Sequence, residues 1–318
     1  MSKVNADLII IGAGPAGLTA AQYGARANLK VLVIEQLSVG GQALVIDALE
    51  NYPGNVGGEG YGPKTGYEFA MDLHRQAESF GASFIYGGVI SLKKNGDIFT
   101  VGLSDGATYT AFAVIIATGA KPRLLDVPGE KEFTGKGVSY CATCDGNFFK
   151  GRKIFVAGGG DAACDEARYL SRLTDKVVMV HRRDSFRAQK ALVKRTLENP
   201  NIKVLFNTII KEIKGVQKVK SVTLADTKTG ETREEEADAV FIFAGTVPQS
   251  SLIADSELNA ELDENGYIIT DQKMATNVPG LYAAGDIRAG AFRQVITAAA
   301  DGAVAAHNAS EYIDENNK

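Results

Sequence analysis

The residues of this chain best suited to chemistry are two cysteines in the segment Cys141-Ala142-Thr143-Cys144-Asp145-Gly146. Thiols separated by two residues can close a small disulfide ring, and an acidic residue follows the second sulfur directly. The chain contains one further cysteine, Cys164. This use of cysteine is typical of a thiol pair that reacts, not of one that staples a core.

Four kinds of site contain two closely spaced cysteines. A zinc site would need more soft ligands nearby, and the chain offers only Cys164 and three histidines. A haem attachment site would need a histidine where Asp145 stands. A structural disulfide is disfavoured, because cytosolic thiols are kept reduced and the chain shows no secretory features. A redox-active dithiol remains, beside which Asp145 would act as a general acid and base or cap a turn.

Length and charge restrict the class of protein. At 318 residues, the chain is long enough for two domains. A net charge of −4 gives no reason to expect nucleic acid as a partner. No apolar run approaches the ~20 residues that span a bilayer, and the first apolar run lacks the basic segment of a signal peptide. We therefore expect a cytoplasmic protein that binds no membrane.

A dinucleotide-binding pattern opens the chain. The apolar run Leu8–Ile11 predicts a buried parallel strand, and Gly12-Ala13-Gly14-Pro15-Ala16-Gly17 leads from it into a helix over Leu18–Ala27. The three glycines would permit a tight turn, a close approach of pyrophosphate to the backbone, and packing of the helix on the strand. Lys30–Ile34 predicts the next strand, and Glu35 stands where an acidic residue would hold ribose hydroxyls. The alternative for Glu35 is a solvated strand end.

Later segments would complete this first site. Two loops rich in turn residues, Gly40–Gln42 and Glu50–Gly54, follow the second strand and would lie over the ligand crevice. Further expected elements are a helix over Tyr67–Phe80, antiparallel strands near 100–101 and 108–110, and a buried strand over Ala113–Ala117 that ends in Thr118-Gly119.

The end of the chain returns to the same site. The short strand Leu281–Asp286 has an acid at its C-terminal end, the edge that faces a ligand, so Asp286 could hold a ribityl hydroxyl of a flavin. Phe292–Val295 then leads into an alanine-rich helix over Thr297–Ser310, whose N-terminus could stabilise a reduced, anionic flavin ring. The polar tail from Asp314 is expected to fray.

A second pattern of the same kind follows the cysteines. Lys153–Ala157 predicts a strand, Gly158-Gly159-Gly160-Asp161-Ala162-Ala163 a phosphate loop with alanine in place of the third glycine, and 162–173 a helix. The next strand, Val177–Val180, ends in the basic cluster His181-Arg182-Arg183 with Arg187, and not in an acid. Such a cluster favours a 2′-phosphate, so this site suits NADPH, whereas the first suits a ligand without that phosphate.

Strand ends define the domain organisation. Strands ending in Thr118-Gly119 and Ala244-Gly245 bracket the second pattern, so the sequence predicts an α/β fold of two Rossmann-like, three-layer (ββα-type) dinucleotide-binding domains, the second inserted in the first. Residues 1–118 and 247–318 would form the first domain, and residues 119–246 the second, which carries the cysteine pair.

Cys164 is expected to be a small buried residue, with a regulatory thiol as the alternative. Further strands are expected over Val204–Ile213, Val219–Leu224 and Ala239–Phe243.

The chain resembles the bacterial-type, low-molecular-weight thioredoxin reductases. The two phosphate loops, Cys141–Gly146, His181–Ala188, Gly285-Asp286 and Arg293–Ala299 carry the resemblance, which runs through nearly the whole chain. It implies FAD in the first domain, NADPH in the second, a homodimer, and thioredoxin as the substrate. Two features depart from the family, since the loop Gly57–Gly66 is richer in glycine and Cys164 replaces an aliphatic residue.

The resemblance also implies which residues contact each cofactor. FAD would contact Gly12, Gly14, Pro15, Ala16, Gly17, Glu35, Gly41, Gln42, Asn51, Thr118, Gly119, Gly285, Asp286, Arg293, Gln294 and Val295. NADPH would contact Gly158, Gly160, Asp161, Ala163, His181, Arg182, Arg183 and Arg187.

For the chemistry, the resemblance implies that hydride passes from NADPH to FAD and on to the Cys141–Cys144 disulfide, whose dithiol reduces thioredoxin. Cys144 would be the sulfur nearest the flavin, and Cys141 the one that attacks thioredoxin. Because the cysteines closely precede Gly158, they belong to the NADPH domain, and both they and the nicotinamide must meet a flavin held by the other domain. We therefore expect a rotation between the domains, with hinges near 117–121 and 244–248.

Three other functions remain open from the sequence. The enzyme could serve another thioredoxin-like or peroxidase-linked partner, although such enzymes usually carry that domain fused at the N-terminus. It could take electrons from a ferredoxin or a reduced flavin, against which the basic cluster argues. It could also be a non-catalytic flavin-binding redox sensor, which the intact dithiol and the second nucleotide site disfavour.

Overall fold

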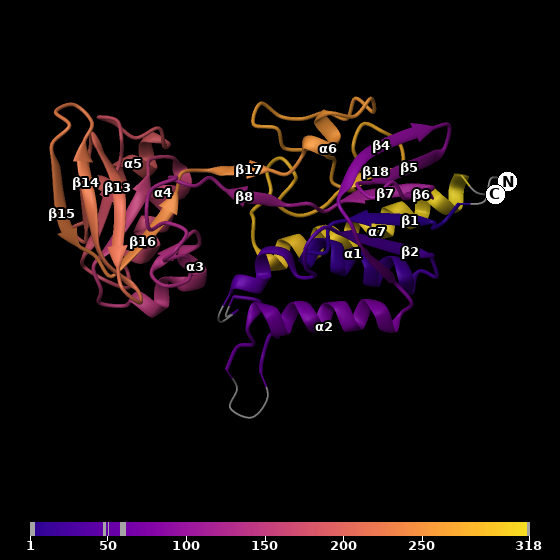
Figure 1. Cartoon of the computed structure of the whole chain (residues 1–318), viewed down its shortest axis with the longest axis horizontal. Helices are drawn as coiled ribbons and strands as arrows, with labels where there is room; N and C mark the ends of the chain where they lie inside the picture. The colour runs from indigo at the N-terminus through magenta and orange to yellow at the C-terminus, as the bar shows by residue number, and fades with distance from the viewer. Residues whose placement is uncertain (1–3, 47–48, 50, 58–61, 317–318) are drawn as a thin grey trace. The chain divides into compact units, whose positions relative to one another are not determined.

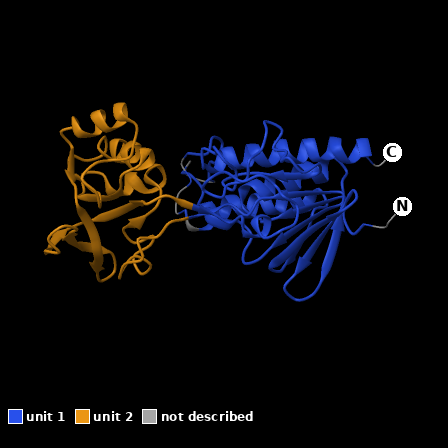
Figure 2. Ribbon diagram, turned by 90° about the horizontal axis from the view of Figure 1, so that it is seen from above, with its two compact units in different colours: residues 1–121, 247–318 blue, residues 122–246 orange. Residues whose placement is uncertain are grey.

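The computed structural model describes residues 4–46, 49, 51–57 and 62–316. Glu50 of the predicted loop Glu50–Gly54 and residues 58–61 of the glycine-rich loop therefore lie outside the described residues. The chain forms two compact units, one of residues 1–121 and 247–318 and the other of residues 122–246 (Figure 2). Within the described part of the chain, no helix is both long enough and apolar enough to cross a membrane.

A five-stranded parallel sheet forms the centre of the first unit (Figure 1). Its middle strands are continuous apolar runs, because a parallel sheet is covered on both faces. In the order in which they pair, the strands are β18 (Leu281–Ala283), β7 (Ala113–Ile116), β1 (Leu8–Ile11), β2 (Val31–Glu35) and β3 (Ser83–Tyr86).

Helices cover one face of this sheet, and a second, antiparallel sheet covers the other. Leu8 and Ile10 of β1 share a buried core with α1 and α7, whereas Ile9 and Ile11 share one with the antiparallel sheet. Alternate side chains of the strand therefore point to opposite faces of the sheet, one toward the helices and the other toward the antiparallel sheet. The covering elements are α1 (Pro15–Arg26), α2 (Gly66–Ser79), which packs on α1, and α7 (Val295–Asn316) on one side, and β4 (Val89–Asn95), β5 (Ile98–Leu103) and β6 (Thr108–Ala111) on the other.

The second unit repeats the same three layers. Its parallel sheet has the order β12-β11-β10-β16-β9, with an antiparallel sheet on one face and helices on the other. Phe155 of the central strand faces the antiparallel sheet, and Val156 faces the helices. The elements are β9 (Val138–Ser139), α3 (Ala142–Asp145), β10 (Ile154–Gly158), α4 (Asp161–Leu170), β11 (Val177–Val180), α5 (Lys190–Leu197), β12 (Ile202–Leu205), β13 (Thr208–Gly215), β14 (Val219–Asp226), β15 (Thr232–Glu236) and β16 (Ala239–Phe243).

Short elements complete the chain. Where it passes from one unit to the other and back, β8 (Ala120–Pro122) pairs with β17 (Thr246–Pro248) in a sheet of two strands. Two 3-10 helices follow functional motifs, η1 over Gly41–Val45 and η2 over Gly146–Phe149, and α6 spans Ser251–Ala254.

The predicted fold class is confirmed, and several elements differ in extent. The single strand predicted over Val204–Ile213 is wrong, because Asn207, at φ 49°, turns the chain between β12 and β13. The tail predicted to fray from Asp314 is helical as far as Asn316, and the last two residues of the chain lie outside the described residues. Cys164 is fully buried, as predicted.

A glycine allows a close contact between two helices of the first unit. A Cβ atom at Gly302 of α7 would overlap the carbonyl oxygen of Ala16 in α1. The two helices therefore meet backbone to backbone beside the first phosphate loop, and an added methyl group would force them apart.

We predict that Gly302→Ala lowers the free energy of unfolding by roughly 1–3 kcal/mol, even though alanine favours the helical state. Urea titration followed by circular dichroism would measure this. Val304→Ala, at an exposed position of the same helix, is the control. Equal stability of the two variants would contradict the proposed helix contact.

Candidate functional site

The cysteine pair forms a disulfide at the start of α3. The Cα atoms of Cys141 and Cys144 are 5.3 Å apart, and both residues are half-buried. The amide of Cys144 donates to Sγ of Cys141 at 3.2 Å, and the Thr143 hydroxyl lies 3.5 Å from the same sulfur. Of the alternatives for two closely spaced cysteines, the structure thus supports a dithiol–disulfide pair over a zinc half-site.

Two residues that the sequence did not single out lie directly before the redox motif Cys141–Gly146, and one of them, Ser139, contacts it. The Ser139 hydroxyl lies 2.5 Å from Oδ2 of Asp145 and accepts the Cys141 amide proton at 3.1 Å. Tyr140 donates its hydroxyl proton at 2.9 Å to Glu130, and burial raises the pKa of Tyr140. Both partners lie several residues away in the sequence, so no local pattern marks them.

Glu130 anchors the loop before the motif. Its side chain is 1% exposed and accepts the amide protons of Leu125 and Asp126 at 3.0 and 2.7 Å. A buried carboxylate with several donors is well compensated for its lost hydration. The segment that leads into Cys141 is therefore fixed at a point outside the disulfide ring.

The first phosphate loop has the shape expected for a nucleotide site. Gly12 has φ 105°, and a Cβ there would lie 2.5 Å from the carbonyl oxygen of Ala117. Pro15 is the first residue of α1, and a Cβ at Gly14 would meet nothing within 4 Å. The open space at Gly14, beside the N-terminus of a 12-residue helix, fits a pyrophosphate group.

Glu35 has a structural contact beside its predicted one. Its carboxylate accepts the amide protons of Ala13 and Leu37 at 2.8 and 2.9 Å. The acid at the end of β2 thus holds the phosphate loop in place. Hydroxyls of a ribose would share this carboxylate with the backbone.

Other predicted flavin residues come together around this loop. A Cβ at Gly41 would lie 3.2 Å from Cα of Gly14, and a Cβ at Gly119 would lie 3.9 Å from Nε2 of Gln42. The Asn51 amide donates to the Gln294 side chain at 3.0 Å. Residues from five separate segments therefore gather at the carboxyl edge of one sheet, as its parallel strands require.

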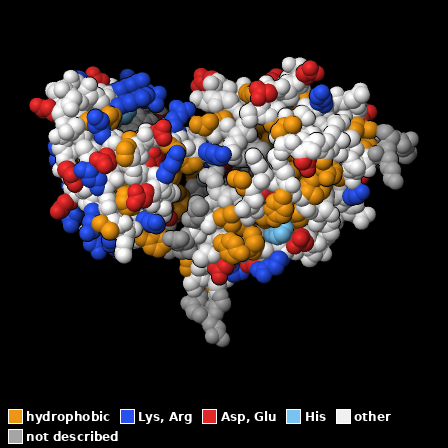
Figure 3. Space-filling model, viewed as in Figure 1, with side chains coloured by type: hydrophobic (Ala, Val, Ile, Leu, Met, Phe, Trp, Pro, Cys, Tyr) orange, Lys and Arg blue, Asp and Glu red, His pale blue; other side chains and the backbone are white. Residues whose placement is uncertain are grey.

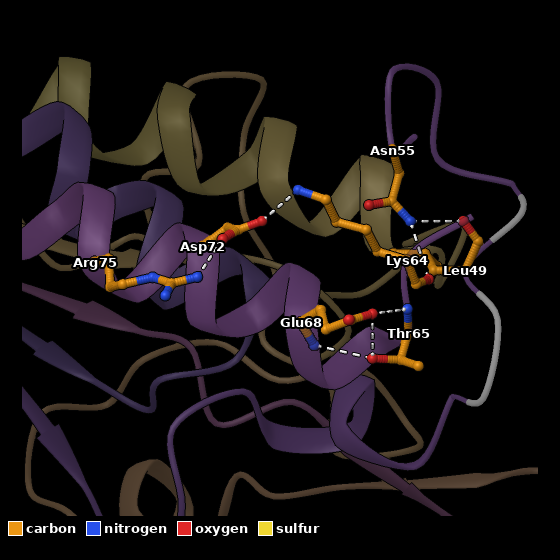
Figure 4. A network of polar contacts seen from close by, with 7 residues as sticks. All are labelled: Leu49, Asn55, Lys64, Thr65, Glu68, Asp72 and Arg75. Carbon is orange, nitrogen blue, oxygen red and sulfur yellow. Dashed lines mark hydrogen bonds and ion pairs between the residues drawn. The ribbon is translucent and has the colours of Figure 1, made fainter. Parts of the chain in front are cut away.

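The loop that carries Asn51 is tied to α2 by a polar network (Figure 4). The Asn55 amide donates to the carbonyl oxygens of Leu49 and Lys64, at 2.9 and 3.3 Å. Lys64 in turn pairs with Asp72 of α2 at 2.6 Å. Thr65 and Glu68 form a capping box at the start of the same helix.

Asp286 is a half-buried acid shortly after β18. Burial raises its pKa to about 6, Arg293 opposes this shift, and Asp301 adds to it. Asp301 accepts the Gly285 amide proton at 3.1 Å and pairs with Arg288 at 2.7 Å. Neither Arg288 nor Asp301 was predicted, because their contacts link the strand end to a helix that begins later in the chain.

The second phosphate loop contacts the basic cluster of the same unit. A Cβ at Gly159 would overlap the imidazole of His181, and the Arg187 amide donates to the Gly159 carbonyl at 2.8 Å. His181 is 6% exposed, its Nε2 has no hydrogen-bond partner among the described residues, and burial lowers its pKa. Asp161 accepts the Gln189 amide proton at 2.7 Å.

Three arginines of this cluster are available to an anion. Arg182, Arg183 and Arg187 are exposed, and none forms a salt bridge within the part of the chain that the structure describes. On the face drawn in Figure 3, Lys and Arg side chains gather on the upper part of this unit. Guanidinium groups without carboxylate partners suit a phosphate.

Two side chains of α4, the helix after the second loop, have a raised pKa. Burial raises the pKa of the Cys164 thiol. Burial, with a contribution from Asp165, raises the pKa of Glu166 to about 7, and its Oε2 is buried without a partner among the described residues. Glu166 was not predicted, because no local pattern marks this half-buried carboxyl group.

The predicted site residues thus form two groups. All of the predicted FAD contacts lie in the first unit. The predicted NADPH contacts lie in the second unit together with the cysteine pair and Asp145.

Comparisons with known proteins agree on one family. The family model described as pyridine nucleotide-disulphide oxidoreductase matches residues 6–302. A thioredoxin reductase of Treponema pallidum (strain Nichols) is 56% identical over 308 residues, which cover 97% of each chain. A thioredoxin reductase of Bacillus subtilis (strain 168) is 45% identical over 97% of this chain and 95% of its own. The crystal structure of thioredoxin reductase from Streptococcus pyogenes MGAS5005 has a TM-score of 0.87 at 44% identity and covers 98% of both chains.

These matches extend over nearly the entire chain, and the protein therefore belongs to the thioredoxin reductases of the pyridine nucleotide-disulphide oxidoreductase family.

Proposed function

We propose that this thioredoxin reductase takes electrons from NADPH and passes them through FAD to the Cys141–Cys144 disulfide, which then reduces thioredoxin. Members of the family typically use FAD and NAD(P)H. The observation that carries the proposal is a disulfide next to an acid, in the same unit as a phosphate loop with unpaired arginines. FAD and NADPH, when bound, would supply the electron pair that opens the disulfide.

The first unit is proposed to be the FAD-binding domain. The space at Gly14 and the N-terminus of α1 would accept the pyrophosphate, and Glu35 the ribose. Asp286, a half-buried carboxyl group with a raised pKa, would accept hydrogen bonds from flavin hydroxyls. Other proposed contacts are Gly12, Pro15, Ala16, Gly17, Gly41, Gln42, Asn51, Thr118, Gly119, Gly285, Arg293, Gln294 and Val295.

The second unit is proposed to be the NADPH-binding domain. His181 has an unpartnered buried nitrogen next to Gly159, which suits a polar ligand at this loop. Arg182, Arg183 and Arg187 would bind the 2′-phosphate and so select NADPH over NADH. Other proposed contacts are Gly158, Gly160, Asp161 and Ala163.

The two sulfurs are proposed to have different tasks. Two electrons break the S–S bond and leave two thiolates, one of which must be protonated while the other attacks thioredoxin. The Cys144 amide and the Thr143 hydroxyl lie within hydrogen-bond reach of Sγ of Cys141, and such contacts favour its thiolate. Cys141 would attack the thioredoxin disulfide, Asp145 would protonate Cys144, and Cys144 would later displace reduced thioredoxin.

Two other features are carried over from the family resemblance. The protein is proposed to be a homodimer, which sedimentation equilibrium would test. The expected rotation between the domains and the cytoplasmic location stay predictions.

Cys141→Ser and Cys144→Ser should each lower NADPH-driven reduction of thioredoxin by about 10³-fold or more, because each removes an obligatory sulfur. Cys164→Ala, which removes the third cysteine, should change the rate by no more than about twofold. The assay follows reduction of insulin or a disulfide dye with and without thioredoxin. Turnover that survives either serine substitution would show that electrons do not pass through this disulfide on their way to thioredoxin.

Arg182→Ala and Arg183→Ala should each raise KM for NADPH roughly 10–100-fold, the worth of one charge-assisted hydrogen bond. KM for NADH should hardly change, because NADH lacks the 2′-phosphate. Arg195→Ala, at an exposed position of α5, is the matched control. A parallel rise for both nucleotides would argue against recognition of that phosphate.

Asp286→Asn should stabilise the flavin-free protein, and more so at pH 8 than at pH 4. The folded-state pKa of about 6 exceeds the ordinary value of 3.8, so wild-type stability falls as the pH rises from about 4 through 6. The difference should reach about 1–2 kcal/mol, since one pKa unit is worth ~1.4 kcal/mol and partial exposure screens some of it.

Denaturant unfolding of flavin-free protein at both pH values measures this effect. Glu264→Gln, an exposed carboxylate in the same unit, is the control. A stability difference that does not vary with pH would show that ionisation of Asp286 does not lower the free energy of unfolding.

A further inference from the structure

Ser139 is a buried polar residue that contacts both ends of the redox motif. It ends β9 and is 5% exposed. Its hydroxyl lies 2.5 Å from Oδ2 of Asp145, accepts the Cys141 amide proton at 3.1 Å, and lies 3.2 Å from the Cys141 carbonyl oxygen. One hydroxyl therefore joins the backbone of the first cysteine to the acid that follows the second.

The direction of these hydrogen bonds follows from the number of protons. A serine hydroxyl donates once, and here it has two possible acceptors, the Asp145 carboxylate and the Cys141 carbonyl. The carboxylate is the stronger acceptor and lies at the shorter distance, so Ser139 donates to Asp145. The Cys141 amide occupies an acceptor position of the same hydroxyl. Such a bond stabilises a carboxylate relative to its protonated form.

We propose that Ser139 is a positioning residue that holds the Asp145 carboxylate beside the cysteine pair and makes it a stronger acid toward the Cys144 thiolate. The inference rests on the proposed role of Asp145. In the step concerned, the bound cofactors supply two electrons and the S–S bond breaks to two thiolates. Asp145 takes up a proton from solvent before this step, and that proton then moves to Sγ of Cys144. The products are one thiol, the Cys141 thiolate, and a carboxylate that again accepts from Ser139.

Other titratable groups face this turn and must be separated from Asp145. Tyr140 and Glu130 are paired with one another before the motif. α4, which packs against α3, carries Asp165 and Glu166, and burial raises the pKa of Glu166 to about 7. β16, which pairs with β9, has no titratable side chain. Glu166→Gln is therefore the control for any effect near neutral pH.

The test compares pH profiles of four variants. Ser139→Ala should lower the rate of thioredoxin reduction roughly 3–30-fold, as loss of a hydrogen bond to a charged group does. Asp145→Asn should abolish one limb of the pH profile, the limb that reports the Asp145 carboxyl group. Ser139→Ala should move this same limb to higher pH, because a carboxylate without its donor has a higher pKa. Ser139→Thr keeps the hydroxyl and should behave like the wild type. Glu166→Gln should leave that limb in place.

Two measurements distinguish an effect of Ser139 on proton transfer from an effect on the packing of the loop. The pH profile is measured for holoenzyme turnover and for a single turnover of chemically reduced, flavin-free protein with oxidised thioredoxin. The midpoint of thermal unfolding and KM for thioredoxin should stay near wild type in Ser139→Ala. If that variant does not fold, Ser139→Cys keeps the side-chain size with a much weaker donor and should show the same shift of the limb.

The outcomes distinguish the two proposals. An unmoved limb in Ser139→Ala, with activity lost in Asp145→Asn, would overturn the inference and leave the role of Asp145 intact. Equal losses in Ser139→Ala and Ser139→Thr would show that packing alone matters, and would also overturn it. Full activity of Asp145→Asn would overturn the role of Asp145 and the inference with it.

Discussion

Parallel strand pairing is the constraint on which both units depend. It brings the carboxyl ends of strands that are distant in sequence to one edge of a sheet, so that β1, β2, β7 and β18 all present their following loops together. The close approach of these loops needs residues without side chains. Gly12 and Gly302 meet backbone carbonyl oxygens at distances that a Cβ atom would not permit. The first site is therefore a consequence of sheet topology and of a few glycines that let helices and loops reach the same edge.

The redox motif depends on the same kind of constraint in the second unit. β9 is the edge strand of its sheet, and its pairing with β16 places Ser139 in the core directly before the cysteines. The chain then turns through α3, which returns Asp145 to Ser139. Glu130 holds Tyr140 from the other side. The disulfide thus lies in a short segment that is fixed at several points outside the ring.

Local patterns in the sequence were sufficient for the fold class, for both phosphate loops and for the cysteine pair. The apolar runs of β1, β7 and β16 show their strands directly, because strands covered on both faces are continuous in sequence. The pattern failed where tertiary contacts decide. An apolar run across Asn207 conceals a change from one sheet to another. Ser139, Glu130 and the pair Arg288–Asp301 have partners on other elements, so their spacing carries no signature.

The central claim is that Cys141 is the sulfur that exchanges electrons with thioredoxin. It is tested most directly by mixing reduced Cys144→Ser protein with oxidised thioredoxin and mapping the covalent adduct by mass spectrometry without a reductant. The account predicts a mixed disulfide between Cys141 and a thioredoxin cysteine, because the sulfur that would release it is absent. An adduct through Cys164, or no adduct under conditions in which the wild-type protein reduces thioredoxin, would contradict it.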